Sequence, residues 1–184
     1  KQHLELTRYI AQKFNNDFKT DLFPIPEPLI FGQATRVMSL RDGTKKMSKS
    51  DPSNFSRIML TDTAEQIEQK IKKAKTDSHP LPSNLEETKT RLEAFNLLSI
   101  FAALNDVSTN EIINKYAEKE FSILKKDLAE TLIEKIRPIS SEMKKLMSDN
   151  KYLDNIVKNG NEKAQEVADS VLSRVYDTVG FFKN

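Results

Sequence analysis

Apolar residues recur at helical spacing over most of the chain, which predicts a mainly α-helical fold. From residue 61 onward the apolar faces are Ala64, Ile67, Ile71 and Ala74; Leu92, Phe95, Leu98, Ile100 and Phe101; Leu124, Leu128, Leu132 and Ile136; Leu153, Ile156 and Val157; and Ala164, Val167, Ala168, Val171, Leu172 and Val175. Proline and glycine predict where three of these helices end: before Pro138, at Gly160 and near Gly180.

Three helix starts carry the pattern of a capping box, in which a small polar residue precedes an acidic residue by three positions. The pairs are Asp62 with Glu65, Ser83 with Glu86, and Ser108 with Glu111. We therefore expect three helices to begin directly after residues 62, 83 and 108.

The first 30 residues predict a helix followed by an extended segment. The stretch KQHLELTRYIAQKFN has helical periodicity but neither an initiator methionine nor a capping residue, so we expect the chain to begin inside a helix of a longer protein. Pro24, Pro26 and Pro28 then exclude a helix, because each lacks a backbone donor and clashes with the preceding turn. Beyond them, ATRVMSL predicts a short strand or extended segment that leads to an Asp42-Gly43 turn.

Composition excludes several classes of site. Cysteine is absent, and the two histidines, His3 and His79, lie far apart, so the sequence predicts neither a disulfide nor a zinc site. The 29 Lys and Arg residues nearly balance 27 Asp and Glu residues, which argues against a polycation that coats nucleic acid. No apolar run is long enough to cross a bilayer, and no stretch resembles a secretory signal. We expect a cytoplasmic protein whose basic sites are local.

The stretch TKKMSKSDPSN, residues 44–54, follows the Asp42-Gly43 turn and is rich in lysine and serine. One interpretation is a solvated loop, in which Ser48 and Ser50 are available to kinases. The other is a mobile loop that holds a polyphosphate, with Lys46 and Lys49 as flexible point charges. Such charges would favour displacement at an α-phosphorus, because they neutralise the departing pyrophosphate.

The pentapeptide Lys46-Met47-Ser48-Lys49-Ser50 resembles the second signature of class I aminoacyl-tRNA synthetases. Other stretches resemble the C-terminal part of bacterial-type tryptophanyl-tRNA synthetases; these are KQHLELTRYIAQKFN, RVMSLRDGTKKMSKSDP, IKKAKTDS, NLLSIFAAL and DLAETLIEKIRPI. The resemblance covers essentially the whole chain. Tyrosyl-tRNA synthetases are the nearest alternative, and the helical tail and the TDS segment favour the tryptophanyl enzymes.

The resemblance implies two domains and an ATP site. Residues 1–55 would be the end of a Rossmann-like nucleotide-binding domain, and residues 56–184 a helical domain of the anticodon-binding type. The pentapeptide would form the ATP-binding loop, in which Lys46 and Lys49 stabilise pyrophosphate, and the backbone of Val37 would help to hold the adenine.

The activity implied by the resemblance is activation of tryptophan with ATP and Mg²⁺, followed by transfer of tryptophan to tRNA(Trp). The family also implies a homodimer. The first class I signature and most of the amino-acid pocket are missing from these residues, so we expect the chain alone to be inactive. Two other hypotheses stay open: a helical RNA-binding module without chemistry, and a helical scaffold controlled by phosphorylation.

Other basic residues have competing structural interpretations. His3 is expected to be a surface or supporting histidine with no assigned role. Arg36 and Arg41 could contact phosphate or tRNA, or form structural ion pairs. The lysines of residues 62–76 are expected to form a solvated helix face paired with Glu65 and Glu68, although they could also contact a tRNA backbone. Arg137 could contact an anticodon base.

Overall fold

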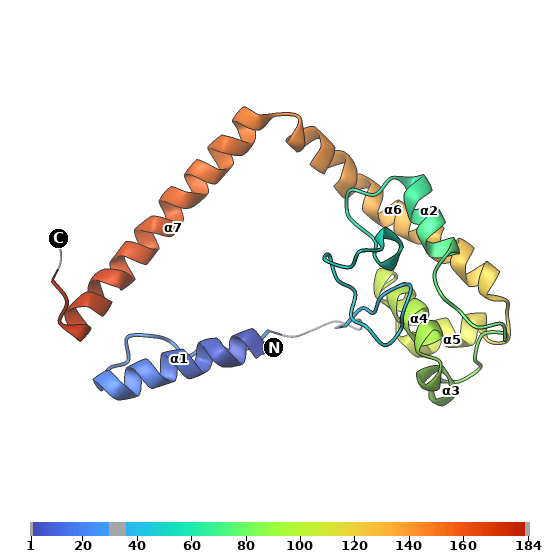
Figure 1. The fold of residues 1–184 in the computed structure, drawn as a ribbon, viewed down its shortest axis with the longest axis horizontal. Helices are drawn as coiled ribbons and strands as arrows, with labels where there is room; N and C mark the ends of the chain where they lie inside the picture. Colours follow the sequence, from blue (N-terminus) through green and yellow to red (C-terminus); the bar gives the residue numbers. More distant parts are fainter. Residues whose placement is uncertain (1, 30–35, 183–184) are drawn as a thin grey trace. The chain divides into compact units, whose positions relative to one another are not determined.

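The computed structural model describes residues 2–29 and 36–182 (Figure 1). The chain forms two compact units, one of Lys1–Ile30 with Asp149–Asn184 and one of Phe31–Ser148. The first unit holds helices α1 (Gln2–Phe18) and α7 (Asn150–Val179). The second unit holds the 3-10 turn η1 (Asn54–Ser56) and helices α2 (Ala64–Lys72), α3 (Leu85–Thr90), α4 (Leu92–Leu104), α5 (Thr109–Tyr116) and α6 (Phe121–Met147). The prediction of a mainly α-helical chain is confirmed.

The proline-rich segment folds back along α1, and as predicted it contains no helix between residues 21 and 29. Phe23 packs edge-on against Phe14, with ring centroids 4.9 Å apart. The amide side chain of Asn15 bonds both backbone groups of Phe23, donating to its carbonyl at 2.7 Å and accepting from its N–H at 3.1 Å. An asparagine amide therefore replaces the backbone partners that the extended segment lacks.

The core of the second unit lies where α2, α4, α5 and α6 meet. Its fully buried side chains include Ile71, Leu98, Ile113, Leu124 and Leu128. These residues belong to the apolar faces that helical spacing predicts, or to α5 between them. Burial of these faces supplies the main driving force for packing the helices of this unit together.

The N-caps at two of the three predicted helix starts are displaced by one residue. Ser108 and Glu111 form the predicted box at the start of α5. At α2 the cap is Thr63, because the carboxylate of Asp62 already accepts from the backbone N–H of Met59 at 2.8 Å and from Lys70 at 2.5 Å. At α3 the N-cap is Asn84, whose side chain accepts from the N–H of Glu87.

Two of the predicted helix ends are wrong, and one is confirmed. Helix α6 continues through Pro138, because the buried face extends beyond it to Ser140, and the carbonyl left without a donor belongs to Glu134 in an exposed turn. Helix α7 continues through Gly160, where an added side chain would meet nothing within 4 Å. Glycine there costs about 1 kcal/mol, which a 30-residue helix tolerates. Gly180 ends α7 in the left-handed conformation at φ 77°.

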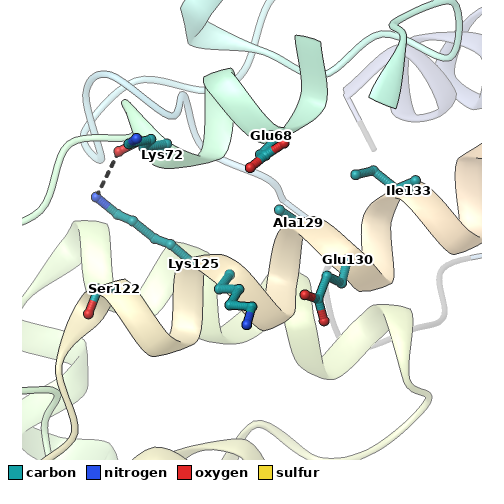
Figure 2. Close-up of a pocket in the computed structure, with 8 residues that line it drawn as sticks. Glu68, Lys72, Ser122, Lys125, Ala129, Glu130 and Ile133 are labelled. Carbon is teal, nitrogen blue, oxygen red and sulfur yellow. Dashed lines mark hydrogen bonds between the residues drawn. The ribbon is translucent and has the colours of Figure 1, made fainter. Parts of the chain in front are cut away.

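The C-terminal end of α2 is held by a lysine from α6. The ammonium of Lys125 donates to the carbonyl oxygens of Ala74 at 2.8 Å and Lys72 at 3.4 Å, and to the hydroxyl of Thr76 at 3.0 Å. Figure 2 shows Lys125 reaching from α6 to Lys72. Burial and the charge of Arg41 lower the pKa of Lys125. These bonds satisfy carbonyls that a helix end leaves without partners.

The hydrogen bond between Tyr116 and Asp127 predicts that the second unit loses stability at alkaline pH. The buried hydroxyl of Tyr116 donates to the carboxylate of Asp127 at 2.5 Å, and burial together with this bond raises the tyrosine's pKa. A raised folded-state pKa stabilises the fold below pH 10, the usual pKa of tyrosine, and this stabilisation is lost as pH rises toward the folded-state value. Urea unfolding should therefore lose up to about 1.4 kcal/mol per pH unit above pH 10 through this residue. Y116F should lose less over the same interval; equal slopes would contradict the assignment.

None of the helices in the described ranges is apolar over a stretch long enough to cross a membrane. Within these ranges, no group of three or more His, Cys, Asp and Glu side chains is placed to hold a metal ion.

Candidate functional site

The segment of residues 37–47 folds back on itself at the Asp42-Gly43 turn. The carboxylate of Asp42 accepts from the hydroxyl of Thr44 at 2.6 Å and from its backbone N–H at 3.0 Å. These bonds, led by the hydroxyl, lower the pKa of Asp42. Gly43 suits this close packing, because a Cβ there would lie only 3.0 Å from backbone atoms of Leu92 and Glu93 at the start of α4. The turn is thereby seated against α4.

The two arms of this turn pair in antiparallel fashion. The N–H of Ser39 donates to the carbonyl of Lys45 at 2.8 Å, and the N–H of Met47 donates to the carbonyl of Val37 at 3.1 Å. They form an isolated bridge between Met38 and Lys46, so the predicted extended segment is present but is too short for a regular strand. Ala34 and Thr35, the first two residues of the predicted segment, lie outside the described residues. We call residues 37–47 the hairpin.

The pentapeptide begins on the second arm of the hairpin and divides into one inward side chain and four outward ones. Met47 packs against the core of the second unit and lines an apolar cavity of about 250 Å³ together with Val37. Lys46, Ser48, Lys49 and Ser50 are exposed. The structure thus places Met47 against the domain beneath the loop.

Lys46 and Lys49 are the two exposed lysines of the pentapeptide. Among the described residues, no carboxylate lies within ion-pair distance of Lys46 or Lys49, whereas the neighbouring Lys45 pairs with Asp42 at 3.4 Å. The hydroxyls of Ser48 and Ser50 lie 2.9 Å apart and are hydrogen-bonded to each other. Two uncompensated ammonium groups and two hydroxyls on one loop are suited to an anion with several oxygens, such as a polyphosphate.

We call residues 44–54 the loop. Its far end is anchored by Arg57, a residue that the sequence interpretation missed. Its guanidinium donates to the carbonyls of Asp51 at 2.8 Å and Ser53 at 3.2 Å, and to the side chain of Asn54 at 2.9 Å. The flanking Asp51-Pro52 turn is closed by the carboxylate of Asp51, which accepts from the N–H of Ser53 at 2.8 Å. The exposed lysines therefore lie between two fixed ends.

Three of the other basic residues named from the sequence, Arg41, Lys70 and Lys75, have structural partners. Arg41 donates to the backbone carbonyl of Lys73 at the end of α2, and Lys75 pairs with Glu93 at 2.9 Å. Lys70 is buried against Asp62, so the prediction of a fully solvated lysine face on this helix is wrong at that position. Lys70 pairs with Asp62 and Lys75 pairs with Glu93, in place of the expected Glu65 and Glu68.

Three of the named positions have no role assigned by their surroundings. His3, Arg36 and Arg137 are exposed. Contacts of Arg36 and Arg137 with tRNA remain predictions.

A cavity between two helices is a different feature from the loop. It measures about 580 Å³ and lies between α2 and α6, lined by Glu68, Lys72, Ser122, Lys125, Lys126, Ala129, Glu130 and Ile133 (Figure 2). Its lysines and glutamates nearly balance, and the ammonium of Lys125 already donates to the carbonyl of Ala74 and the hydroxyl of Thr76. The loop is therefore the better candidate for binding a polyanion.

Comparison with known proteins places the chain in a family. Residues 1–141 match the family model described as tRNA synthetases class I (W and Y). The chain is 54% identical over 183 residues to a tryptophan–tRNA ligase of Caulobacter vibrioides, covering 99% of this chain and 53% of that protein. It is 48% identical over 181 residues to a tryptophan–tRNA ligase of Rickettsia felis, covering 98% of this chain and 54% of that protein. The chain thus spans about half the length of these curated relatives.

Two solved structures share the fold of this chain. The tryptophanyl-tRNA synthetase of Mycoplasma pneumoniae superposes with a TM-score of 0.80 at 30% identity, over 99% of this chain and 56% of that one. A Campylobacter jejuni tryptophanyl-tRNA synthetase, solved with ADP and tryptophan, superposes with a TM-score of 0.65 at 22% identity, over 98% of this chain and 54% of that one. With the family match over most of its length, the chain belongs to the class I tRNA synthetases of the tryptophan and tyrosine type.

Proposed function

We propose that this chain is part of a tryptophan–tRNA ligase and that its exposed loop binds the phosphates of ATP. The observation that carries the proposal is a pair of ammonium groups, Lys46 and Lys49, that have no acidic partner among the described residues and lie on a loop with both ends anchored. The names of the curated relatives favour tryptophan over tyrosine as the amino acid.

In the proposed reaction, a carboxylate oxygen of tryptophan attacks the α-phosphorus of ATP. The bond from that phosphorus to the bridging oxygen breaks, and pyrophosphate leaves with the electron pair. Lys46 and Lys49 would neutralise the charge that builds on the departing pyrophosphate, while the hydroxyls of Ser48 and Ser50 donate to its oxygens. Val37, whose carbonyl is already bonded to Met47, would present its remaining backbone surface to the adenine.

Other parts of the proposal come from the family. Mg²⁺ would arrive with ATP as part of the substrate. The tryptophanyl-adenylate would then transfer tryptophan to tRNA(Trp), in a cytoplasmic homodimer. The division into a Rossmann-like end at residues 1–55 and a helical tRNA-binding domain at 56–184 remains a proposal; the loop and helices α2 to α6 belong to one compact unit.

The test uses a fusion enzyme, made by joining this chain to the portion of the Caulobacter vibrioides relative that lies outside the match. We expect the fusion enzyme to catalyse ATP–pyrophosphate exchange that depends on tryptophan and not on tyrosine, and the 184-residue chain alone to catalyse none. Exchange by the chain alone would contradict the proposal that it holds only part of the ATP site. Exchange that depends on tyrosine would overturn the tryptophan assignment.

A further inference from the structure

The first arm of the hairpin has two hydrogen-bonding edges, and each has a different partner. Ser39 and Val37 bond to the second arm, and the bridge that they form sets Met38 directly opposite Lys46. In this type of antiparallel pair, the backbone groups of the two opposed residues point away from each other. The N–H and carbonyl of Met38 are therefore directed away from the pentapeptide.

Asn96 from α4 occupies this outer edge as a neighbouring strand would. Its side-chain oxygen accepts from the N–H of Met38 at 2.9 Å, and its side-chain nitrogen donates to the carbonyl of Met38 at 2.9 Å. Asn96 is only 5% exposed and lies between buried residues of the same helix, including Ala94 and Leu97. Two bonds to one residue fix both the distance and the register of Met38, which an apolar contact would not do.

A second contact from the same helix face holds the tip of the hairpin. Glu93 lies three residues before Asn96, so the two side chains share one side of α4. The backbone of Gly43 packs against Leu92 and Glu93, and the pKa of Glu93 is lowered mainly by its bond from Lys75 and also by the N–H of Gly43. Helix α4 therefore holds the hairpin at its turn and at the residue facing Lys46.

We propose that Asn96 is a positioning residue for phosphate binding: it holds Met38, and through the bridge it sets the place of Lys46 and of the loop that carries Lys49. This inference rests on the proposed function of the loop. Asn96 itself touches no substrate; it acts by fixing the backbone from which the charged side chains extend. A buried amide that only satisfied its own hydrogen bonds would not alter the action of the lysines.

The first test measures the hairpin in the 184-residue chain. The variant is N96L, which keeps the approximate shape of the side chain and removes both bonds to Met38. Hydrogen exchange should become about tenfold faster or more at the amides of Ser39 and Met47, because the paired arms lose their outer support. The matched control is Y116F, which removes a buried hydrogen bond of the same unit without touching the hairpin and should leave these two amides unchanged. Unchanged exchange in N96L would overturn the inference.

The second test asks whether Asn96 acts through the lysines, using the fusion enzyme and rates normalised to titrated active sites. N96L should lower the exchange rate about tenfold while the KM for tryptophan stays unchanged. When Lys46 and Lys49 are both already alanine, N96L should have no further effect beyond about twofold, because the groups that it positions are gone. An equal loss in both backgrounds would show a merely structural role and overturn the inference.

The two proposals can fail separately. If K46A/K49A leaves the exchange rate of the fusion enzyme unchanged, the proposed function of the loop is wrong. If K46A/K49A lowers exchange at least about 100-fold and N96L alone leaves the exchange rate of the fusion enzyme unchanged, only the positioning role of Asn96 is wrong.

Discussion

Replacing Lys46 or Lys49 with alanine should lower tryptophan-dependent ATP–pyrophosphate exchange by the fusion enzyme about 100- to 1000-fold. This is the loss expected when one preorganised group that stabilises transition-state charge is removed, on the order of 3 kcal/mol. Both ammonium groups are exposed and unpaired within the described residues, so neither substitution removes an ion pair that supports the fold.

Lys45 provides the matched control for these two lysines. It is exposed, adjacent in sequence to Lys46, and paired with Asp42 at 3.4 Å. An exposed ion pair contributes at most about 1 kcal/mol to stability, so K45A should change the exchange rate by no more than about twofold. Equal losses in all three variants would indicate a general effect of positive charge, and would contradict specific roles for Lys46 and Lys49.

The second large effect is on stability. D62A should lower the free energy of unfolding of the second unit by about 3–5 kcal/mol, because it leaves the buried ammonium of Lys70 without its partner. The two charged groups lie 2.5 Å apart, and each side chain is only 9% exposed. The same carboxylate also accepts from the N–H of Met59, which loses its partner as well. Urea unfolding followed by circular dichroism measures this change.

A variant that removes both charges of the Asp62–Lys70 pair tests whether the unpaired ammonium causes the loss of stability. Removing both charges in D62N/K70M should recover a large part of the stability lost in D62A, because no unpaired charge is then buried. K145A is a matched lysine control: Lys145 pairs with Glu142 at 3.4 Å on an exposed face and should change stability by less than about 1 kcal/mol. A double variant as unstable as D62A would show that the buried charge is not the cause.

The helices could be predicted from the sequence because their apolar faces become the buried core. Ile71, Leu98 and Leu128 are each predicted from spacing and each is fully buried. Helix ends were harder, since a local signal competes with packing. Pro138 and Gly160 are both strong stop signals, yet helix α6 keeps its buried face beyond the first and the 30-residue helix α7 absorbs the second.

The loop could be predicted from its sequence, but its anchors could not. Lys46 and Lys49 are conspicuous because they lie close together in a recognisable pentapeptide. Asn96 lies 58 residues from Met38, and nothing local specifies that the two meet. The one available signal was an amide within the apolar stretch LEAFNLLSIFAAL, since a buried amide needs partners for both of its ends. Arg57 gave no such signal, because a single arginine after a polar turn is usually exposed.

The central claim is that the loop performs phosphate chemistry and does not merely bind RNA. The most direct measurement compares adenylate formation with tRNA binding in K46A/K49A of the fusion enzyme. We predict that adenylate formation falls at least about 100-fold while the affinity for tRNA(Trp), measured at fixed salt, changes less than about threefold. Lost tRNA affinity with preserved adenylate formation would contradict the claim and would make the loop part of an RNA-binding module.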